Sequence, residues 1–203
     1  MRKLLLTTVA AIAFAAPASA KVQFVSSYGV WTVYAGTTDK GKPICGMLIK
    51  DNTPAGRTLH VKAIDGFGGI LLMAWKPGWR IPDETEMPIT LGFDRDTFGS
   101  TTAYGYTSAG DESSHIEFRV VEGPATAKFL EEFAHADVMV LRFDSGSEVP
   151  WSMKMDGSRK AANDFAYCMA KYIRPATTQP YPQASTQPYS QGQSASTLPR
   201  PTQ

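Results

Sequence analysis

Hydrophobic and polar positions alternate most clearly near the end of the chain. In residues 151–156 (WSMKMD), every second side chain is a tryptophan or methionine and the others are polar, a period typical of a half-buried strand. Asp156-Gly157 predicts a tight turn after it. Ser158 is placed to cap a helix. Apolar side chains then recur at steps of four, three and four, which predicts one buried helix face made by Ala161, Phe165, Cys168 and Tyr172.

Shorter apolar segments separated by turn residues predict eight more strands. They lie at residues 28–34, 44–50, 59–64, 69–75, 87–93, 101–106, 115–121 and 138–143. Gly123-Pro124 predicts the start of another helix, with Phe129 and Phe133 on its apolar side. Short, regularly spaced strands favour an antiparallel sheet over alternating βαβ units. We therefore expect a mainly β fold, an antiparallel sandwich or half-open barrel with two helices, the C-terminal helix packed on a sheet.

The two ends of the chain differ in composition from the middle. Residues 1–20 combine a basic start, an apolar run and a small-x-small end, the pattern of a secretory signal peptide cleaved after Ala20. A membrane anchor is the alternative, but the run is shorter than the ~20 residues that a spanning helix needs. Residues 174–203 are rich in Pro, Gln, Ser and Thr, which predicts a disordered tail with a TQPY repeat. Residues 21–173 remain as one β-rich globular domain.

Export affects how the two cysteines, Cys45 and Cys168, are interpreted. In an oxidising compartment a pair of cysteines predicts one disulfide rather than a metal or redox site. Closing a loop of about 120 residues is worth ~4–5 kcal/mol in the chain-entropy model. Two buried thiols that never meet are the alternative. We expect a periplasmic or secreted protein without a membrane span after cleavage.

Charge and motifs exclude several functions. Without Arg2 and Lys3, 18 basic residues face 19 acidic ones, so no basic surface for nucleic acid is expected. The three histidines (His60, His115 and His135) lack metal-ligand spacing, and no cofactor motif is present. Asp94-Arg95-Asp96 offers only two carboxylates, too few for a good calcium site, and a solvated turn is the favoured interpretation. No Gly-x-Ser-x-Gly or Ser-x-x-Lys motif marks a nucleophile, so we predict no catalytic residues, with a hydrolase lacking a recognisable motif as an alternative.

One stretch remains as a candidate binding surface. Trp75 to Arg80 (WKPGWR) places Trp75, Trp79 and Arg80 around a proline–glycine turn, and aromatic rings beside cations bind glycans or proteins. Tyr104 and Tyr106 share one face of a strand and could widen this surface. The alternative is that both tryptophans point into the core.

The order of these elements resembles the invasion-associated locus B family of exported alphaproteobacterial proteins. The likeness rests on the strand with Tyr28-Gly-Val-Trp31, the cysteine strand at Pro43–Gly46, the Phe129-x-x-x-Phe133 helix and the final strand–turn–helix from Trp151. Tyr34 stands where that family would have a further cysteine. The resemblance implies a non-enzymatic envelope protein linked to host-cell entry. We therefore expect a domain that binds a protein of the envelope or host, with a cell-wall glycan or a wall-degrading enzyme as the alternative target.

Overall fold

The computed structural model describes residues 21–50, 55–107 and 114–174. The predicted signal peptide lies outside the described residues, as does the predicted tail apart from Arg174. Within the described ranges, ten strands and two helices follow one another as β1 (Lys21–Tyr28), β2 (Trp31–Thr37), β3 (Pro43–Lys50), β4 (Thr58–Ile64), β5 (Ile70–Trp75), β6 (Glu86–Phe93), β7 (Asp96–Thr107), β8 (Ser114–Val120), α1 (Pro124–His135), β9 (Val138–Phe143), β10 (Trp151–Lys154) and α2 (Ser158–Tyr172).

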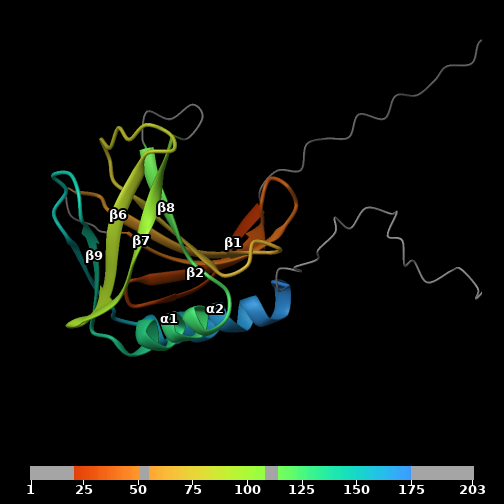
Figure 1. Ribbon diagram of the computed structural model, residues 1–203. Coiled ribbons are helices and arrows are strands. Elements are labelled where there is room, and N and C mark those ends of the chain that lie inside the picture. Colours follow the sequence, from red (N-terminus) through yellow and green to blue (C-terminus); the bar gives the residue numbers. More distant parts are fainter. Residues whose placement is uncertain (1–20, 51–54, 108–113, 175–203) are drawn as a thin grey trace, which may run out of the picture.

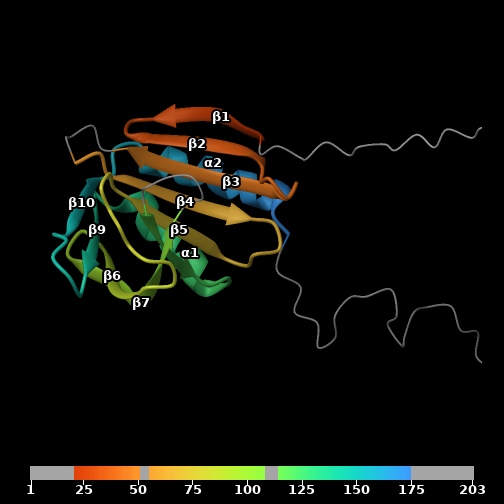
Figure 2. The same ribbon diagram turned by 90° about the horizontal axis from the view of Figure 1, so that it is seen from above.

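All ten strands form one antiparallel sheet in the order β1-β2-β3-β4-β5-β8-β7-β6-β9-β10. The sheet is strongly bent. In Figure 1, β6, β7 and β9 stand upright while β1 and β2 run across, and both helices lie below. Seen from above, β1 to β5 lie side by side, and α2 lies beneath β1, β2 and β3 (Figure 2). The sheet is not closed into a barrel, since the described residues form no ladder between β1 and β10. The expected mainly β, antiparallel fold is confirmed.

The sequence prediction missed β1 and merged its end with β2. Residues 28–34 were expected to form one strand, but Gly29 turns the chain at a φ of 56° and Tyr28 pairs with Trp31 across the hairpin. The segment KVQFVSSY lacks a simple alternation because the ladder is irregular between Phe24 and Ser26. A β-bulge shifts the side chains that follow it to the other face, which hides the period of two.

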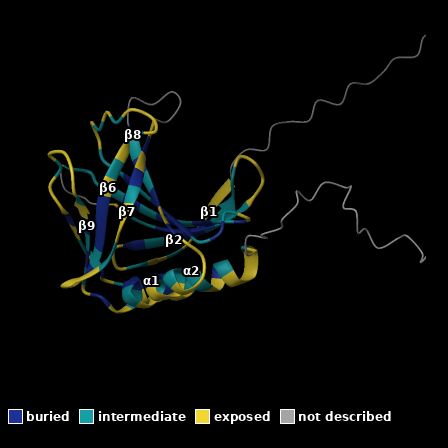
Figure 3. Ribbon diagram, in the orientation of Figure 1, coloured by how far each residue is buried: buried dark blue, intermediate teal, exposed yellow. Residues whose placement is uncertain are grey.

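The core lies between the inner face of the sheet and the two helices. Trp31, Trp151, Phe129, Phe133 and Phe165 are fully buried there. Helix α1 contributes Phe129 and Phe133, as its spacing predicted, and the Phe133 ring packs edge-on against Trp31 with 4.6 Å between ring centroids. Figure 3 shows that the helices are exposed on the side away from the sheet and more buried on the side that faces it.

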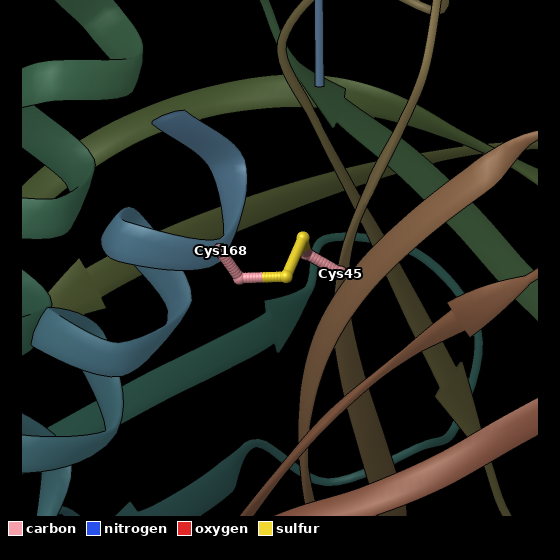
Figure 4. Close-up of a disulfide and its surroundings, with 2 residues drawn as sticks. All are labelled: Cys45 and Cys168. Atoms are coloured by element: carbon pink, nitrogen blue, oxygen red, sulfur yellow. A yellow bond between two sulfur atoms is a disulfide. The ribbon is translucent and has the colours of Figure 1, made fainter. Parts of the chain in front are cut away.

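A disulfide joins Cys45 of β3 to Cys168 of α2 (Figure 4). The pairing predicted from the cysteine count is therefore confirmed, and it fastens α2 across the strands on which it packs. Phe165 is buried beside it, which is worth about 1.5–3 kcal/mol. Two local expectations were wrong. Tyr172 is 47% exposed rather than buried, and the helix cap is Gly157, with no side-chain cap from Ser158.

The two ends of the sheet meet at a pair of turns. The Val30 N–H donates to the Asp156 carbonyl at 3.2 Å, which joins the β1–β2 turn to the β10–α2 turn. Asp164 of α2 reinforces this corner by accepting hydrogen bonds from Ser26 Oγ at 2.8 Å and Tyr28 Oη at 2.7 Å. Turn contacts and a helix, rather than strand pairing, therefore hold the open side together.

Arg174, directly after α2, is also fixed in place. Its backbone N–H and guanidinium donate to the carboxylate of Asp65, with 2.6 Å between Nη2 and Oδ2. These hydrogen bonds lower the pKa of Asp65 to about 2. The end of α2 is thereby tied to the turn that follows β4.

Candidate binding surface

The sheet has a second face, turned away from both helices, that we call the outer face. On β4 and β8 the core residues alternate with His60, Lys62, His115 and Glu117, which therefore belong to this opposite face. Tyr34 and Leu71 are buried but lie outside the core cluster. The outer face therefore buries side chains of its own.

The strand register brings aromatic residues together on the outer face. Trp75 of β5 pairs with His115 of β8, and His115 pairs in turn with Tyr106 of β7. In the next row, Glu117 pairs with both Met73 and Tyr104. Directly opposed residues project from the same face. Trp75, Tyr104 and Tyr106, three residues of the predicted surface, therefore share the outer face.

The exposed part of this face includes two tyrosines, one of which stacks on a histidine. Tyr104 and Tyr106 are 41% and 40% exposed, while Trp75 is half-buried. The Tyr106 ring stacks on His115 with 5.7 Å between centroids, and His115 Nε2 lies 3.4 Å from Glu117 Oε1. The stacking contact orients Tyr106 before any ligand arrives.

The inner part of the same face holds ionisable groups in a poorly hydrated setting. The Tyr34 ring lies over Gly46, where a Cβ would come within 2.2 Å of its ring, and it meets His60 edge-on at 6.4 Å between centroids. Burial raises the pKa of Tyr34 to about 12. Burial, with the nearby Lys62 and His115, lowers the pKa of His60 to about 4, and no residue in the described part of the chain gives Nδ1 of His60 a hydrogen-bond partner.

Lys62 lies in the same setting. Burial lowers the pKa of Lys62, and Glu117 opposes that effect in part. Its Nζ donates to Met73 Sδ at 3.4 Å.

The depressed pKa of His60 predicts that acid destabilises the fold. An unfolded histidine takes up a proton below about pH 6.5, whereas folded His60 stays neutral to about pH 4, so stability falls as the pH drops through this window. The integrated loss is about 3 kcal/mol. Urea unfolding at pH 7 and pH 4.5 should show a smaller acid loss in His60→Gln than in the wild type. An equal loss of stability between pH 7 and pH 4.5 in the two proteins would show that His60 does not cause the acid sensitivity.

Trp79 and Arg80 are not part of the outer face. The Trp79 ring stacks on Trp151 at 5.2 Å between centroids and meets Phe143 edge-on, while Arg80 is exposed in the loop beyond. Trp79 also shares one acceptor with Trp151, since both indole N–H groups donate to the carboxylate of Glu148. The two indoles of the turn from Trp75 to Arg80 therefore lie apart: Trp75 belongs to the outer face, and Trp79 packs against Trp151 and Phe143.

Glu148 also accepts from Lys76 Nζ at 2.7 Å. Burial by itself would raise the pKa of Glu148, but the hydrogen bonds from Lys76, Trp151 and Trp79 outweigh burial and lower it. A carboxylate satisfied in this way holds Trp79 in an internal position.

Sequence reasoning overlooked the histidines and Glu117 as neighbours of the tyrosines. The available signal was their spacing, because His60-x-Lys62 and His115-x-Glu117 each place two polar side chains on one strand face. The alternative in which Trp75 points inward is wrong, because the inward positions of β5 belong to Ile70, Leu72 and Ala74.

Other chemistry suggested by the sequence is satisfied internally. Asp94 Oδ1 accepts the backbone N–H groups of Asp137 and Val138, so this carboxylate holds a turn. Among the residues that the structure describes, no group of three or more His, Cys, Asp or Glu side chains is arranged to hold a metal ion. Neither helix in the described part of the chain is long and apolar enough to cross a membrane.

Comparison with known proteins does not add a relative. No protein-family model matches the chain, and neither a curated protein nor a solved structure matches it. The surfaces of this molecule are therefore the guide to its function.

Proposed function

We propose that this protein is a non-enzymatic binding domain of the bacterial envelope, periplasmic or secreted, which uses its outer face to bind another protein. The observation that carries the proposal is the shared face of Trp75, Tyr104 and Tyr106 beside His115 and Glu117. Tyrosine and tryptophan are enriched where a few residues dominate protein–protein affinity. The disulfide between Cys45 and Cys168 and the leader-like residues 1–20 agree with action outside the cytoplasm.

The composition of this face favours a protein partner. The two half-exposed tyrosine rings supply apolar area, and the stacking on His115 already orients Tyr106, so little of its side-chain entropy is lost on binding. His115 and Glu117 border the rings with groups that can form hydrogen bonds. The resemblance to the invasion-associated locus B family agrees with such a role and would place the partner in the envelope or on a host cell.

A cell-wall glycan is the second candidate. The rings of Trp75 on β5, His115 on β8 and Tyr106 on β7 span about 10 Å across the strands, since neighbouring strands lie about 4.8 Å apart. Aromatic rings displayed in this way can stack on sugar rings. Trp79 no longer supports this idea, because its ring is engaged by Trp151 and Phe143.

The test uses the disulfide-bonded mature chain, residues 21–203, immobilised and exposed to envelope extract and, separately, to purified peptidoglycan. Tyr104→Ala combined with Tyr106→Ala should reduce recovery of the partner protein roughly 10- to 100-fold, because truncating a central tyrosine commonly costs 2 kcal/mol or more. Tyr167→Ala is the matched control, since Tyr167 is 69% exposed on α2, away from the outer face.

The two ligand classes give different outcomes. Loss of a protein band only in the outer-face variant supports the protein partner, and loss of peptidoglycan binding only in that variant supports the glycan. A partner retained equally by the outer-face variant and the control, or no partner in either arm, would refute the proposal.

A further inference from the structure

Strands β7 and β8 separate from one another within the sheet. Their ladder runs only from Tyr104, opposite Glu117, to Thr107, opposite Ser114. Beyond this point β7 continues with β6 to Asp96, whereas β8 continues with β5 to Val120. Figure 1 shows the two strands diverging toward the helices. We call the resulting gap the β7–β8 wedge.

The wedge leaves backbone groups of both strands without a ladder partner. Gly105 exchanges hydrogen bonds with Glu84 and Thr85 on the β6 side of β7. Because N–H and C=O groups alternate between the two edges of a strand, those of Ser100 and Thr102 point to the β8 side. The same alternation turns the backbone of Arg119 in β8 toward β7. Among the described residues, none forms a backbone hydrogen bond with these groups across the wedge.

An apolar pocket of about 260 Å³ lies in the wedge. Its apolar lining comes from Leu91, Phe98, Phe118, Val120, Val121 and Ala125. Phe118 and Val120 belong to the core, so the pocket reaches the interior from the surface. Its volume exceeds that of one leucine or phenylalanine side chain, and Gly99 in its wall has nothing within 4 Å of the position of a Cβ.

We propose that the β7–β8 wedge is a binding site for an extended peptide segment of a partner protein. The segment adds as a strand to the free edge of β7 and places one large apolar side chain in the pocket. Main-chain hydrogen bonds to Ser100 and Thr102 supply affinity for any extended backbone, and the pocket selects the side chain. The site is separate from the exposed tyrosines of the outer face, because it opens where the Tyr104–Glu117 pair ends.

The probe is a capped peptide, acetyl-Thr-Thr-Val-Leu-Val-Thr-Lys-amide, added to the isotope-labelled mature chain. Binding should slow hydrogen exchange at the amides of Ser100, Thr102 and Arg119, which exchange quickly without peptide. Replacing the central leucine of the probe by alanine should weaken binding roughly 50-fold, since three buried carbon groups are lost. A probe with N-methylated amides should not bind.

Three variants of the protein test the pocket and its separation from the outer face. Gly99→Leu fills the pocket and should abolish probe binding, because open space surrounds this position and its φ is not positive. Thr102→Leu, on the same strand with its side chain on the other face, should retain binding. Tyr106→Ala should also retain it, which separates this site from the proposed function.

Three results would overturn the proposal. The first is slow exchange at Ser100 and Thr102 before peptide is added. The second is equal binding by the N-methylated probe or by the folded Gly99→Leu variant. The third is no binding of the leucine probe at millimolar concentration.

Discussion

Replacing both Cys45 and Cys168 by alanine should lower the free energy of unfolding by about 5 kcal/mol. The bond closes a sequence separation of 123 residues, and the entropy that the cross-link removes from the unfolded chain grows with that length. The bond also holds α2 on β2 and β3. Since domains of this size are stable by 5–15 kcal/mol, the loss is a large fraction of the total. Urea unfolding followed by circular dichroism measures it.

Reduction provides the control for this prediction. A strong phosphine reductant should shift the wild-type midpoint toward that of the double-alanine variant and leave the variant unchanged. Hydrogen exchange in α2 should accelerate more than in β6, which packs in the other half of the sheet. Identical unfolding curves for oxidised and reduced wild type would show that the bond contributes nothing.

Gly157→Ala should lower the free energy of unfolding by about 2–5 kcal/mol. Gly157 has a φ of 86°, and a Cβ there would lie 2.2 Å from the carbonyl oxygen of Tyr28. A left-handed conformation costs a non-glycine residue about 1–2 kcal/mol, and the clash with a rigid backbone adds a further 1–3 kcal/mol. Gly29, on the other side of the contact, is equally close to Asp156. The corner where the two ends of the sheet meet therefore excludes even a methyl group.

Gly146→Ala is the matched control. Gly146 has a nearly equal φ of 81°, but nothing lies within 4 Å of the position of its Cβ. Gly146→Ala should lower the free energy of unfolding only by the cost of the left-handed conformation, about 1–2 kcal/mol. The difference between the two variants in urea unfolding isolates the turn–turn contact. Equal losses would show that this contact does not hold the sheet ends together.

Local sequence patterns predicted most elements because those elements depend on neighbouring residues. The β9 strand begins and ends where its apolar run does, and α1 begins at Pro124 and buries Phe129 and Phe133. β7 extends further than expected, from Asp96 to Thr107, since pairing with β6 recruits Gly, Ser and Thr residues that carry no strong strand signal. Pairing partners, rather than intrinsic preference, set the length of such a strand.

The candidate surface was only partly visible in the sequence. The spacing of Tyr104 and Tyr106 is sufficient to place them on one strand face. That Trp75 joins them depends on β8 lying between β5 and β7, an arrangement of strands distant in the chain. The position of Trp79 depends on Glu148 and Trp151, about 70 residues away. Patterns within a single strand carry no information about either contact.

The sequence by itself determined the class of the fold, its two helices and the pairing of its only two cysteines. The fold class and the helices follow from short-range periodicity, and the disulfide follows because two cysteines allow only one pairing. The tertiary structure alone decided the bend of the sheet, the turns that meet at Gly29 and Gly157, the shared outer face and the β7–β8 wedge. Each of these depends on which distant strands lie side by side, and strand order is set by the packing of the whole core.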